Sequence, residues 1–376
     1  MIGGDALGVA LGDDMEQGAD RLPIGARRPV RVLSPAAAGL ALALFVASLV
    51  TGCGPAAPDE HVFEGATMGT RYTVRVVGPS FGAERLEQIR QRIEERLDDV
   101  NSKMSTYQAD SELSQFNRWQ ETTPFGLSSE TIRVFAEALE LSRWSDGAFD
   151  VTVGPLVNAL GFGPAGEPLA LPTDEERAEL LRHVGWQKLT LDSAAGTLSK
   201  SDPEVYCDLS AVAKGYGVDR VAEGLEDLGV ESYMVEVGGE VRTAGTNRHG
   251  EAWQIGIERP VSEARQLQKV VPMSGWAMAT SGDYRNFYIR DGRRWSHTID
   301  PRTGLPIEHG AASVSVVTPT CLEADGLATT LMVLGPEEGY RRAEDAGLAV
   351  LFLLFDGQGG FEEKATTAFE ALLAKG

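Results

Sequence analysis

Apolar side chains recur along the chain with two different periods, and each period predicts one kind of secondary structure. Within residues 71–77 every second side chain is apolar, which is typical of a strand with one buried face. Farther along, apolar residues are separated by three or four positions, at Leu86, Ile89, Ile93, Leu97 and Val100. Such spacing gives an α-helix one apolar face, so it predicts an amphipathic helix.

The remaining patterns predict a mixture of short helices and strands. Helices are expected at 129–145 and after Thr173, where Thr173 and Glu176 form a capping box and Gly185 ends the helix. Strands are expected at 232–237, 253–258, 311–317 and 348–355, with glycine turns between strands and few helices in the second half. The fold class is therefore α+β, with antiparallel sheets and flanking helices in one large domain of one or two lobes.

The N-terminal segment has the features of an export signal. Three arginines precede the uncharged run 36–50, whose 15 residues are too few to span a membrane comfortably. The run closes on Gly52-Cys53, which resembles a bacterial lipobox. This predicts a signal peptide at 1–52, a lipidated Cys53 with a tether at 53–61, and a working domain at 62–376. The alternative is an uncleaved signal anchor with an incidental cysteine.

Composition narrows the class of protein further. The 376 residues carry 34 Lys and Arg against 55 Asp and Glu, a formal net charge of −21. An apolar share of 43% and a charged share of 24% are ordinary for globular proteins and exclude a wholly disordered chain. So acidic a chain is unsuited to coat nucleic acid, and three cysteines cannot build a disulfide framework.

Two pairs of polar residues suggest a site for a phosphorylated ligand. Asp208 and Lys214 flank the expected N-terminus of a helix that runs to Leu228, where free N–H groups and a lysine favour an anion. Asp325 and Thr329 lie four positions apart, so on a helix their oxygens share one face and suit Mg²⁺. In each case the alternative is structural, with the acid as a helix cap and Lys214 as a solvated surface residue.

Two further clusters combine polar residues with turns. In 296–304 an Asp-Pro turn is placed to hold His297 and Asp300 rigidly beside a site. In 237–240 two glycines end a strand, where a flat ligand could approach the backbone. The chain lacks Cys/His metal spacings, a G-x-S-x-G elbow, GxGxxG and a Walker loop, so zinc, serine-hydrolase, Rossmann and P-loop sites are not expected.

In this order along the chain, the motifs resemble those of one family. Besides the clusters above they are Gly69-Thr-Arg-Tyr72, Ser105-Thr-Tyr107, Ser111-Glu-Leu-Ser-Gln-Phe-Asn117, Gly147-Ala-Phe-Asp150, Thr152-Val-Gly-Pro-Leu156 and Ala279-Thr-Ser-Gly-Asp-Tyr-Arg-Asn-Phe287. The chain resembles the ApbE family from about Phe63 to about Gly360. Members are FAD:protein FMN transferases, bacterial lipoproteins with a fold related to the T-fold.

The resemblance implies a role for particular residues. It implies that FAD is bound by Met68, Tyr107, Ala148, Phe149, Asp150, Asp208, Lys214 and Ile299. It places Mg²⁺ on the Ala211 carbonyl with the side chains of Asp325 and Thr329, and it makes His297 the histidine needed for transfer. The residue patterns themselves support Lys214 and the Asp325/Thr329 pair, whereas nothing in the side-chain types of Met68, Tyr107 or Ala211 marks them. Cys207 and Cys321 adjoin two of these segments and either lie close together or are unrelated buried thiols.

The resemblance also implies a reaction, partners and a location. A threonine hydroxyl in a short small-residue motif of an exported acceptor flavoprotein, such as a redox-complex subunit, attacks the FMN-side phosphorus of FAD, and AMP leaves. Mg²⁺ and Lys214 stabilise charge, and His297 is the expected base, with Asp300 or Asp283 next. The enzyme is expected in the cell envelope, lipid-anchored outside the cytoplasm. The alternatives are a Mg²⁺-dependent FAD pyrophosphatase and a non-catalytic flavin-binding lipoprotein.

Overall fold

The computed structural model describes residues 58–164, 166–168, 170–260, 266–282, 287–290 and 293–374. The predicted signal peptide, its lipobox and Cys53 lie outside these residues. The tether was expected to reach residue 61, but the first strand already begins at Asp59. Residues Ala57–Gly376 form one compact unit rather than two lobes. Within the described ranges, no helix has the length and apolar character needed to cross a membrane.

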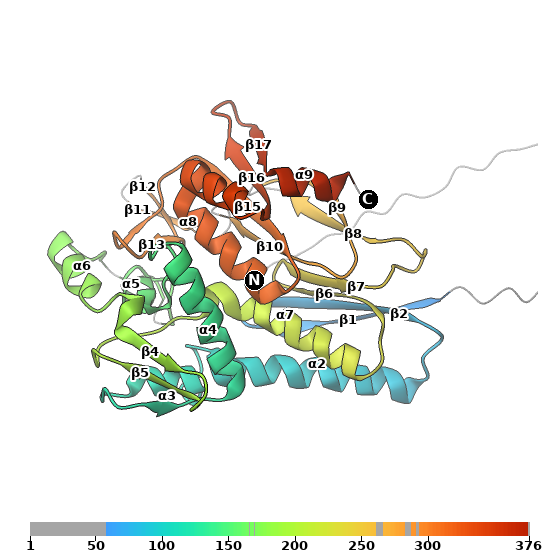
Figure 1. Ribbon diagram of the computed structural model, residues 1–376, viewed down its shortest axis with the longest axis horizontal. Coiled ribbons are helices and arrows are strands. Elements are labelled where there is room, and N and C mark those ends of the chain that lie inside the picture. The colour runs from blue at the N-terminus through green and yellow to red at the C-terminus, as the bar shows by residue number, and fades with distance from the viewer. Residues whose placement is uncertain are drawn as a thin grey trace, which may run out of the picture. The chain divides into compact units, whose positions relative to one another are not determined.

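A single large antiparallel sheet forms the centre of the described chain (Figure 1). Every neighbouring pair in it is antiparallel, which confirms the predicted α+β class. In spatial order its strands are β1 (Asp59–Thr67), β2 (Thr70–Gly78), β6 (Ser232–Val237), β7 (Glu240–Ala244), β10 (Ala277–Gly282), β15 (Ala311–Thr318), β16 (Ala349–Phe355) and β17 (Phe361–Ala365).

Three helices pack on one face of this sheet and on one another: α2 (Ala83–Met104), α7 (Ser210–Asp227) and α8 (Cys321–Asp345). The face of α2 that the apolar spacing predicts is buried, at Ile89, Ile93, Leu97 and Val100. Ile89, Ile93 and Leu97 join apolar residues of β1, β2, β6 and α7 in one cluster, and Val100 belongs to the neighbouring cluster. Burial of this stripe stabilises α2 in place on the sheet, because removing apolar surface from water favours folding.

The opposite face of the sheet is covered by a hairpin and a short helix. The hairpin consists of β8 (Trp253–Glu258) and β9 (Leu267–Met273), and the helix is α9 (Thr367–Leu373). Their apolar residues share a cluster with β7, β10, β15 and β16, among them Trp253, Val271 and Phe369. The sheet is therefore buried on both faces.

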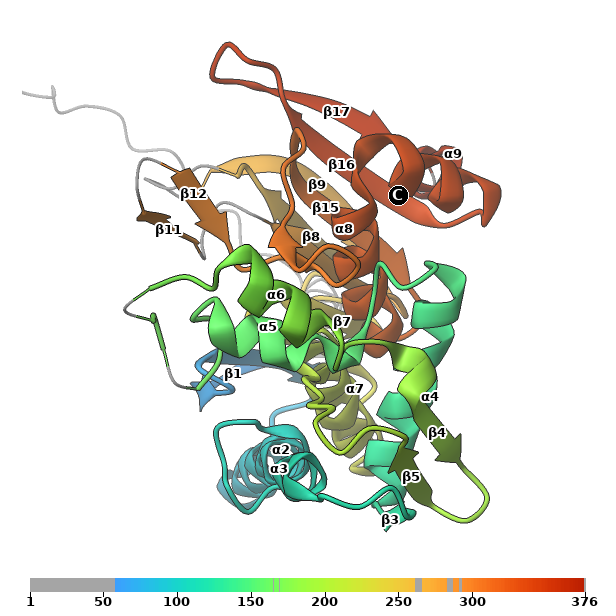
Figure 2. The same ribbon diagram turned by 90° about the vertical axis from the view of Figure 1, so that its left-hand side faces the viewer.

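Smaller elements extend the molecule at one end. α4 (Ser129–Trp144) lies near α3 (Glu112–Arg118) and a small sheet of β3 (Phe125–Gly126), β5 (Thr197–Lys200) and β4 (Leu189–Asp192) (Figure 1). α5 (Gly154–Ala159) and α6 (Asp174–Leu181) lie on the same side of the molecule as the hairpin of β11 (Phe287–Arg290) with β12 (Arg293–Ser296) (Figure 1 and Figure 2). A second short hairpin, of β13 (Ile299–Asp300) with β14 (Leu305–Pro306), lies near them in Figure 1. Single turns of 3₁₀ helix occur at Val151–Val153 and Trp186–Lys188.

Three of the sequence predictions about secondary structure need correction. The capping box on α6 is present, but the helix ends at Leu181, and Gly185 instead precedes the next 3₁₀ turn. The last predicted strand begins one residue late, at Ala349. The second half also contains α8, a 25-residue element interrupted at Gly335, where φ is 78° before Pro336. Because α8 is buried on most sides, its apolar residues have no single-face period and its pattern does not predict a helix.

Helices α7 and α8 approach each other unusually closely at Gly215. A Cβ added there would overlap the carbonyl oxygen of Cys321 and lie 2.7 Å from the Cβ of Asp325. Because the overlapping atom belongs to the backbone of α8, it cannot turn aside as a side-chain tip would. Glycine at position 215 is therefore what permits this spacing between the helices.

We predict that Gly215→Ala lowers the free energy of unfolding by about 1–3 kcal/mol, the usual cost of overpacking a core. The measurement is chemical denaturation of both proteins. Gly224→Ala in the same helix is the matched control, because its added Cβ would meet only the flexible side chains of Arg92 and Arg96 at 3.0 Å or more. Equal midpoints for the two variants would show that the close helix spacing is not required.

Candidate functional site

A cavity of about 1120 Å³ opens where α7, α8 and the ends of several strands meet. Nine of the residues singled out from the sequence line it: Met68, Tyr107, Asp208, Ala211, Lys214, His297, Ile299, Asp325 and Thr329. They come from segments spread over more than 250 positions of the chain. Their common location is as predicted, while the particular role of each residue stays a prediction.

The other three predicted FAD-binding residues do not line the cavity. Ala148, Phe149 and Asp150 are buried in the core, with exposures of 1%, 3% and 6%. Asp150 accepts hydrogen bonds from the N–H groups of Thr152 and Trp186. The segment supports the site from behind, since the Val151 carbonyl accepts from the N–H of Asp208 at 2.7 Å. A direct contact of these three residues with FAD stays untested.

The charged centre of the cavity is formed by three residues from three elements. Lys214 on α7 places its Nζ 3.0 Å from Glu240 Oε1 at the start of β7 and 3.5 Å from Asp325 Oδ1 on α8. Both carboxylates are almost fully buried, whereas the lysine is about one-third exposed at the cavity surface. An ammonium between two buried carboxylates neutralises only one of them.

Burial and mutual attraction alter the proton affinities of these groups. Burial raises the pKa of Asp325, and it raises the pKa of Glu240 to about 8, although Lys214 acts in the opposite direction on both. Burial alone would lower the pKa of Lys214, but attraction to Asp325 and Glu240 outweighs it and raises that pKa. Lys214 is therefore a permanent cation in the cavity.

Asp325 is held in place by the backbone of α7. The N–H of Gly215 donates to Asp325 Oδ2 at 2.9 Å. In a regular α-helix this N–H is the partner of the Ala211 carbonyl, which also lines the cavity. One turn along α8, Thr330 donates its hydroxyl to the Gly326 carbonyl, while among the described residues no hydrogen bond involves the hydroxyl of Thr329. A carboxylate, a hydroxyl and a backbone carbonyl thus belong to residues that line the same cavity, and these are oxygen ligands of the kind that Mg²⁺ takes together with retained waters.

This donor set is small for a metal site. In the described ranges no group of three or more His, Cys, Asp or Glu residues is arranged to hold a metal ion. Such a group would be expected for zinc, whose sites use several nitrogen or thiolate ligands. The oxygen donors at Asp325 therefore fit Mg²⁺, with Lys214 as a competitor for the same carboxylate.

His297 also lines the cavity, from a position between two short strands. It follows β12 directly and precedes β13, whose Asp300 closes the turn by accepting from the N–H of Gly304 at 2.8 Å. The His297 ring contacts Phe162 edge-on at 6.3 Å, and Phe162 stacks on Tyr288 at 5.4 Å. The rigid Asp-Pro turn predicted from the sequence is thus present, and an aromatic cluster fixes the histidine.

The second-choice bases named from the sequence are less well placed. Asp300 does not line the cavity, and its carboxylate forms a two-pronged ion pair with Arg302 of its own turn at 2.8 and 2.9 Å. Asp283 lies outside the described residues. His297 remains the better candidate of the three.

Two glycine-containing turns bring backbone close to the cavity. Met68 and Gly69 form the two-residue turn between β1 and β2, and Met68 has a φ of 49°, which is rare for a residue with a side chain. Gly238 and Gly239 join β6 to β7 with φ values of 64° and 109°. The predicted strand-ending glycines are therefore present, and a Cβ on Gly238 would lie 3.4 Å from the Lys214 chain.

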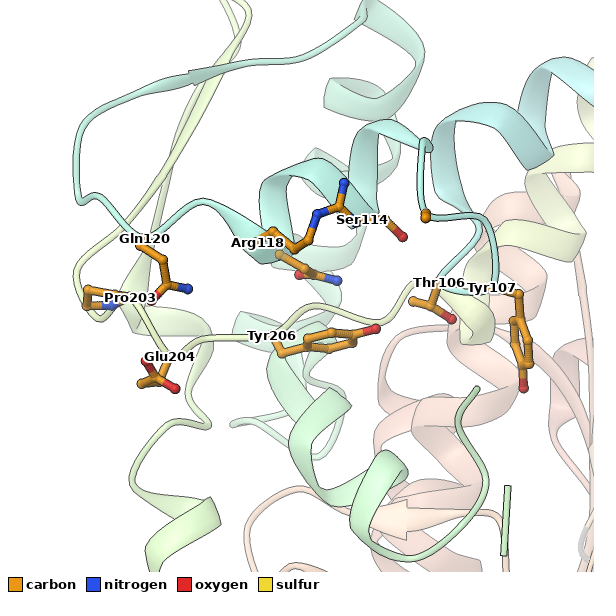
Figure 3. Close-up of a pocket in the computed structure, with 10 residues that line it drawn as sticks. Thr106, Tyr107, Ser114, Arg118, Gln120, Pro203, Glu204 and Tyr206 are labelled. Carbon is orange, nitrogen blue, oxygen red and sulfur yellow. The ribbon is translucent and has the colours of Figure 1, made fainter. Parts of the chain in front are cut away.

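A smaller polar pocket of about 450 Å³ adjoins the cavity and shares Thr106 and Tyr107 with it. Figure 3 shows the Tyr206 ring in the middle of this pocket, with Arg118 beside it and Glu204 toward one end. Tyr107 is 69% exposed and donates to the Phe162 carbonyl at 3.5 Å, so it connects the two sides of the cavity rim. The two cysteines near the site, Cys207 and Cys321, are both free and buried in separate apolar clusters.

Sequence reasoning did not assign a role to Glu240. It noted the two glycines before this residue but not the acid itself. The sequence feature that could have identified Glu240 is its place at the start of a strand, directly before the apolar and buried Val241. Thr280 and Ser281 also line the cavity, from a segment quoted only for its resemblance.

A model of the ApbE family matches residues 68–352. The chain belongs to the ApbE family. It is 45% identical over 327 residues to an FAD:protein FMN transferase of Vibrio cholerae, covering 87% of this chain and 96% of that protein. It is 47% identical over 312 residues to the protein of that name from Haemophilus influenzae, covering 82% and 90%.

Solved structures agree with this membership. The flavin transferase ApbE of Vibrio cholerae superposes with a TM-score of 0.77 at 44% identity, over 84% of this chain and 99% of that one. The apo form of the flavinyl transferase ApbE of Pseudomonas stutzeri has a TM-score of 0.77 at 39% identity, over 86% and 100%. The single α+β domain predicted from the sequence is thus the ApbE fold.

Proposed function

We propose that this ApbE family member transfers FMN from FAD to a threonine hydroxyl of an acceptor protein and releases AMP. The observation that carries the proposal is the single cavity that joins Lys214, the Asp325 oxygen cluster and His297. Its volume of about 1120 Å³ exceeds that of ordinary small-molecule pockets and suits a dinucleotide. The names of relatives that are 45% and 47% identical support the same activity.

The reaction exchanges one phosphoester partner for another. The acceptor hydroxyl oxygen bonds to the FMN-side phosphorus of FAD, the bond from that phosphorus to the AMP oxygen breaks, and the hydroxyl proton passes to a base. Lys214 offers a fixed positive charge to the pyrophosphate and to the charge that develops on the leaving AMP. No charge reorganisation is needed, because Glu240 and Asp325 already hold the ammonium.

Asp325, Thr329 and the Ala211 carbonyl would hold Mg²⁺. When bound, Mg²⁺ would neutralise pyrophosphate oxygens and lower the cost of the developing charge. His297 is placed to take the threonine proton, since it lines the cavity and its ring is held by Phe162. Phe162, Val153 and Val157 give that side an apolar surface, which limits water beside the reacting hydroxyl.

The proposal includes the cell envelope as the site of action. Cys53 would be acylated and residues 1–52 removed, so that the enzyme is anchored to a membrane by lipid and meets exported acceptor flavoproteins outside the cytoplasm. Support comes from the uncharged run 36–50 that closes on Gly52-Cys53. Acceptors would present a threonine in a short small-residue motif, as the family resemblance implies.

The transfer itself is tested with FAD, Mg²⁺ and an acceptor that carries such a motif, with flavin fluorescence in a denaturing gel and AMP release read together. The matched control is the acceptor with its threonine changed to valine. We expect one flavin attached for each AMP released, and none on the valine acceptor. AMP without flavin on the threonine acceptor would make the enzyme an FAD pyrophosphatase instead.

For the metal site, we predict that Asp325→Asn weakens Mg²⁺ binding by at least about 100-fold, since it removes the one formal charge among the ligands. Asparagine still accepts a hydrogen bond from Gly215, so the fold is preserved. Thr329→Val should be milder, because water can replace a neutral oxygen. Thr330→Val is the control, since this hydroxyl bonds within α8. Unchanged Mg²⁺ affinity in Asp325→Asn would place the metal elsewhere.

For the base, we predict that His297→Ala slows transfer by about 10²–10⁴ while FAD binding stays nearly unchanged. Single-turnover flavin transfer and FAD titration measure the two effects separately. His249→Ala, at an exposed position, serves as the control for loss of a histidine. Transfer at the wild-type rate in His297→Ala would show that another base takes the threonine proton.

For the anchor, we predict that Cys53→Ala moves the protein from the membrane fraction to the soluble fraction and prevents the mass increase of acylation. Fractionation and mass spectrometry of the mature protein measure this. Changing the buried Cys207 to alanine should leave fractionation unaltered. A Cys53→Ala protein that stays membrane-bound with an unchanged N-terminus would favour the signal-anchor alternative.

A further inference from the structure

Glu240 has no assigned part in the reaction, yet it is one of the most constrained polar residues of the cavity. Its side chain is 5% exposed, and Oε1 accepts from Lys214 at 3.0 Å. Its second oxygen, Oε2, is buried without a hydrogen-bond partner. A carboxylate so placed is costly unless it is paired, so its retention requires Lys214.

Lys214 is shared unequally between the two carboxylates. Its Nζ lies 3.0 Å from Glu240 but 3.5 Å from Asp325 Oδ1. Asp325 Oδ2 is already bonded to the N–H of Gly215, so Oδ1 is the oxygen with capacity left for a cation. An ammonium drawn fully onto Oδ1 would occupy the place of Mg²⁺, whose oxygen ligands lie at about 2.0–2.1 Å.

We propose that Glu240 is a positioning residue that holds the Lys214 ammonium away from Asp325 and so leaves Asp325 Oδ1 for Mg²⁺. This inference rests on the proposed Mg²⁺ site. Its geometric basis is that β7, α7 and α8 bring Glu240, Lys214 and Asp325 together from three separate elements. Without Glu240, Asp325 would be the nearest counter-ion for Lys214.

The test is a thermodynamic cycle of Glu240→Gln and Lys214→Met, singly and together, with Mg²⁺ alone as the ligand. Calorimetric Mg²⁺ titration without FAD measures affinity, and thermal unfolding with near-ultraviolet circular dichroism confirms that each variant is folded. We expect Glu240→Gln to weaken Mg²⁺ binding by roughly tenfold or more when Lys214 is present, as for contacting charged residues. In the Lys214→Met background, Glu240→Gln should weaken Mg²⁺ binding by less than about threefold.

The cycle separates this role from others that Glu240 could have. If Glu240 were a direct Mg²⁺ ligand, or if its charge acted on the cation alone, Glu240→Gln would weaken Mg²⁺ binding as much or more in the Lys214→Met background. That result would overturn the proposal. A purely structural role would lower the unfolding temperature of Glu240→Gln without changing Mg²⁺ affinity, which would overturn it too. Glu240→Asp keeps the charge and should restore part of the lost affinity.

Lys214→Met alone provides a second test that does not depend on the folding of Glu240 variants. Removing the competing ammonium should leave Mg²⁺ affinity at least equal to wild type, and a weaker affinity would overturn the proposal. The Asp325→Asn variant tests the proposed metal site itself. If that variant binds Mg²⁺ as the wild type does, the proposed metal site is wrong; if it loses Mg²⁺ while Glu240→Gln does not, only the positioning role is wrong.

Discussion

The close contact of α7 with α8 is the constraint on which the rest of the site depends. Gly215 lets the helices approach, and its N–H fixes Asp325 from the neighbouring helix. The start of α8 is also held from α7, since Asp219 accepts from the N–H groups of Cys321 and Leu322 at 2.9 Å. Thr320, the N-cap of α8, makes no side-chain cap, so α7 supplies the acceptor that α8 lacks. The two helices thus position the proposed metal ligands as one unit.

Strand β7 completes this unit through two residues on one face. Glu240 pairs with Lys214, and Arg242, two positions on, pairs with Asp219 at 2.9 Å. Each pair therefore joins the sheet to α7 at a residue that also reaches α8. Alternate residues of β7 face the opposite side, where Val241 joins the apolar cluster under the β8–β9 hairpin. A short strand thereby couples the apolar core to the charged centre of the cavity.

A helix with one apolar face was predictable, and a helix buried on most sides was not. Residues 232–237 and 253–258 were predicted with the bounds that β6 and β8 have, because their apolar residues alternate. The pattern of α2 was equally direct. In contrast, the first part of α8, from Cys321 to Gly335, is buried on nearly all sides, and the only feature predicted for α8 was the i, i+4 pair Asp325 and Thr329. Lys214 was recognisable as a cation near a helix N-terminus, but Met68 and Tyr107 entered only through family resemblance, since their side-chain types carry no distinctive chemistry.

The sequence by itself determined the α+β class, several of the helices and strands, the candidate charged residues and the family, because these depend on local periodicity, turns and the order of motifs. Only the tertiary structure decided that nine candidates share one cavity, that Ala148, Phe149 and Asp150 lie behind it, and that Glu240 is part of the charged centre. Glu240, Lys214 and Asp325 meet across 111 positions of chain through helix and sheet packing. Contacts over such a separation cannot be predicted from the local sequence, because they depend on how the buried surfaces of distant elements pack together.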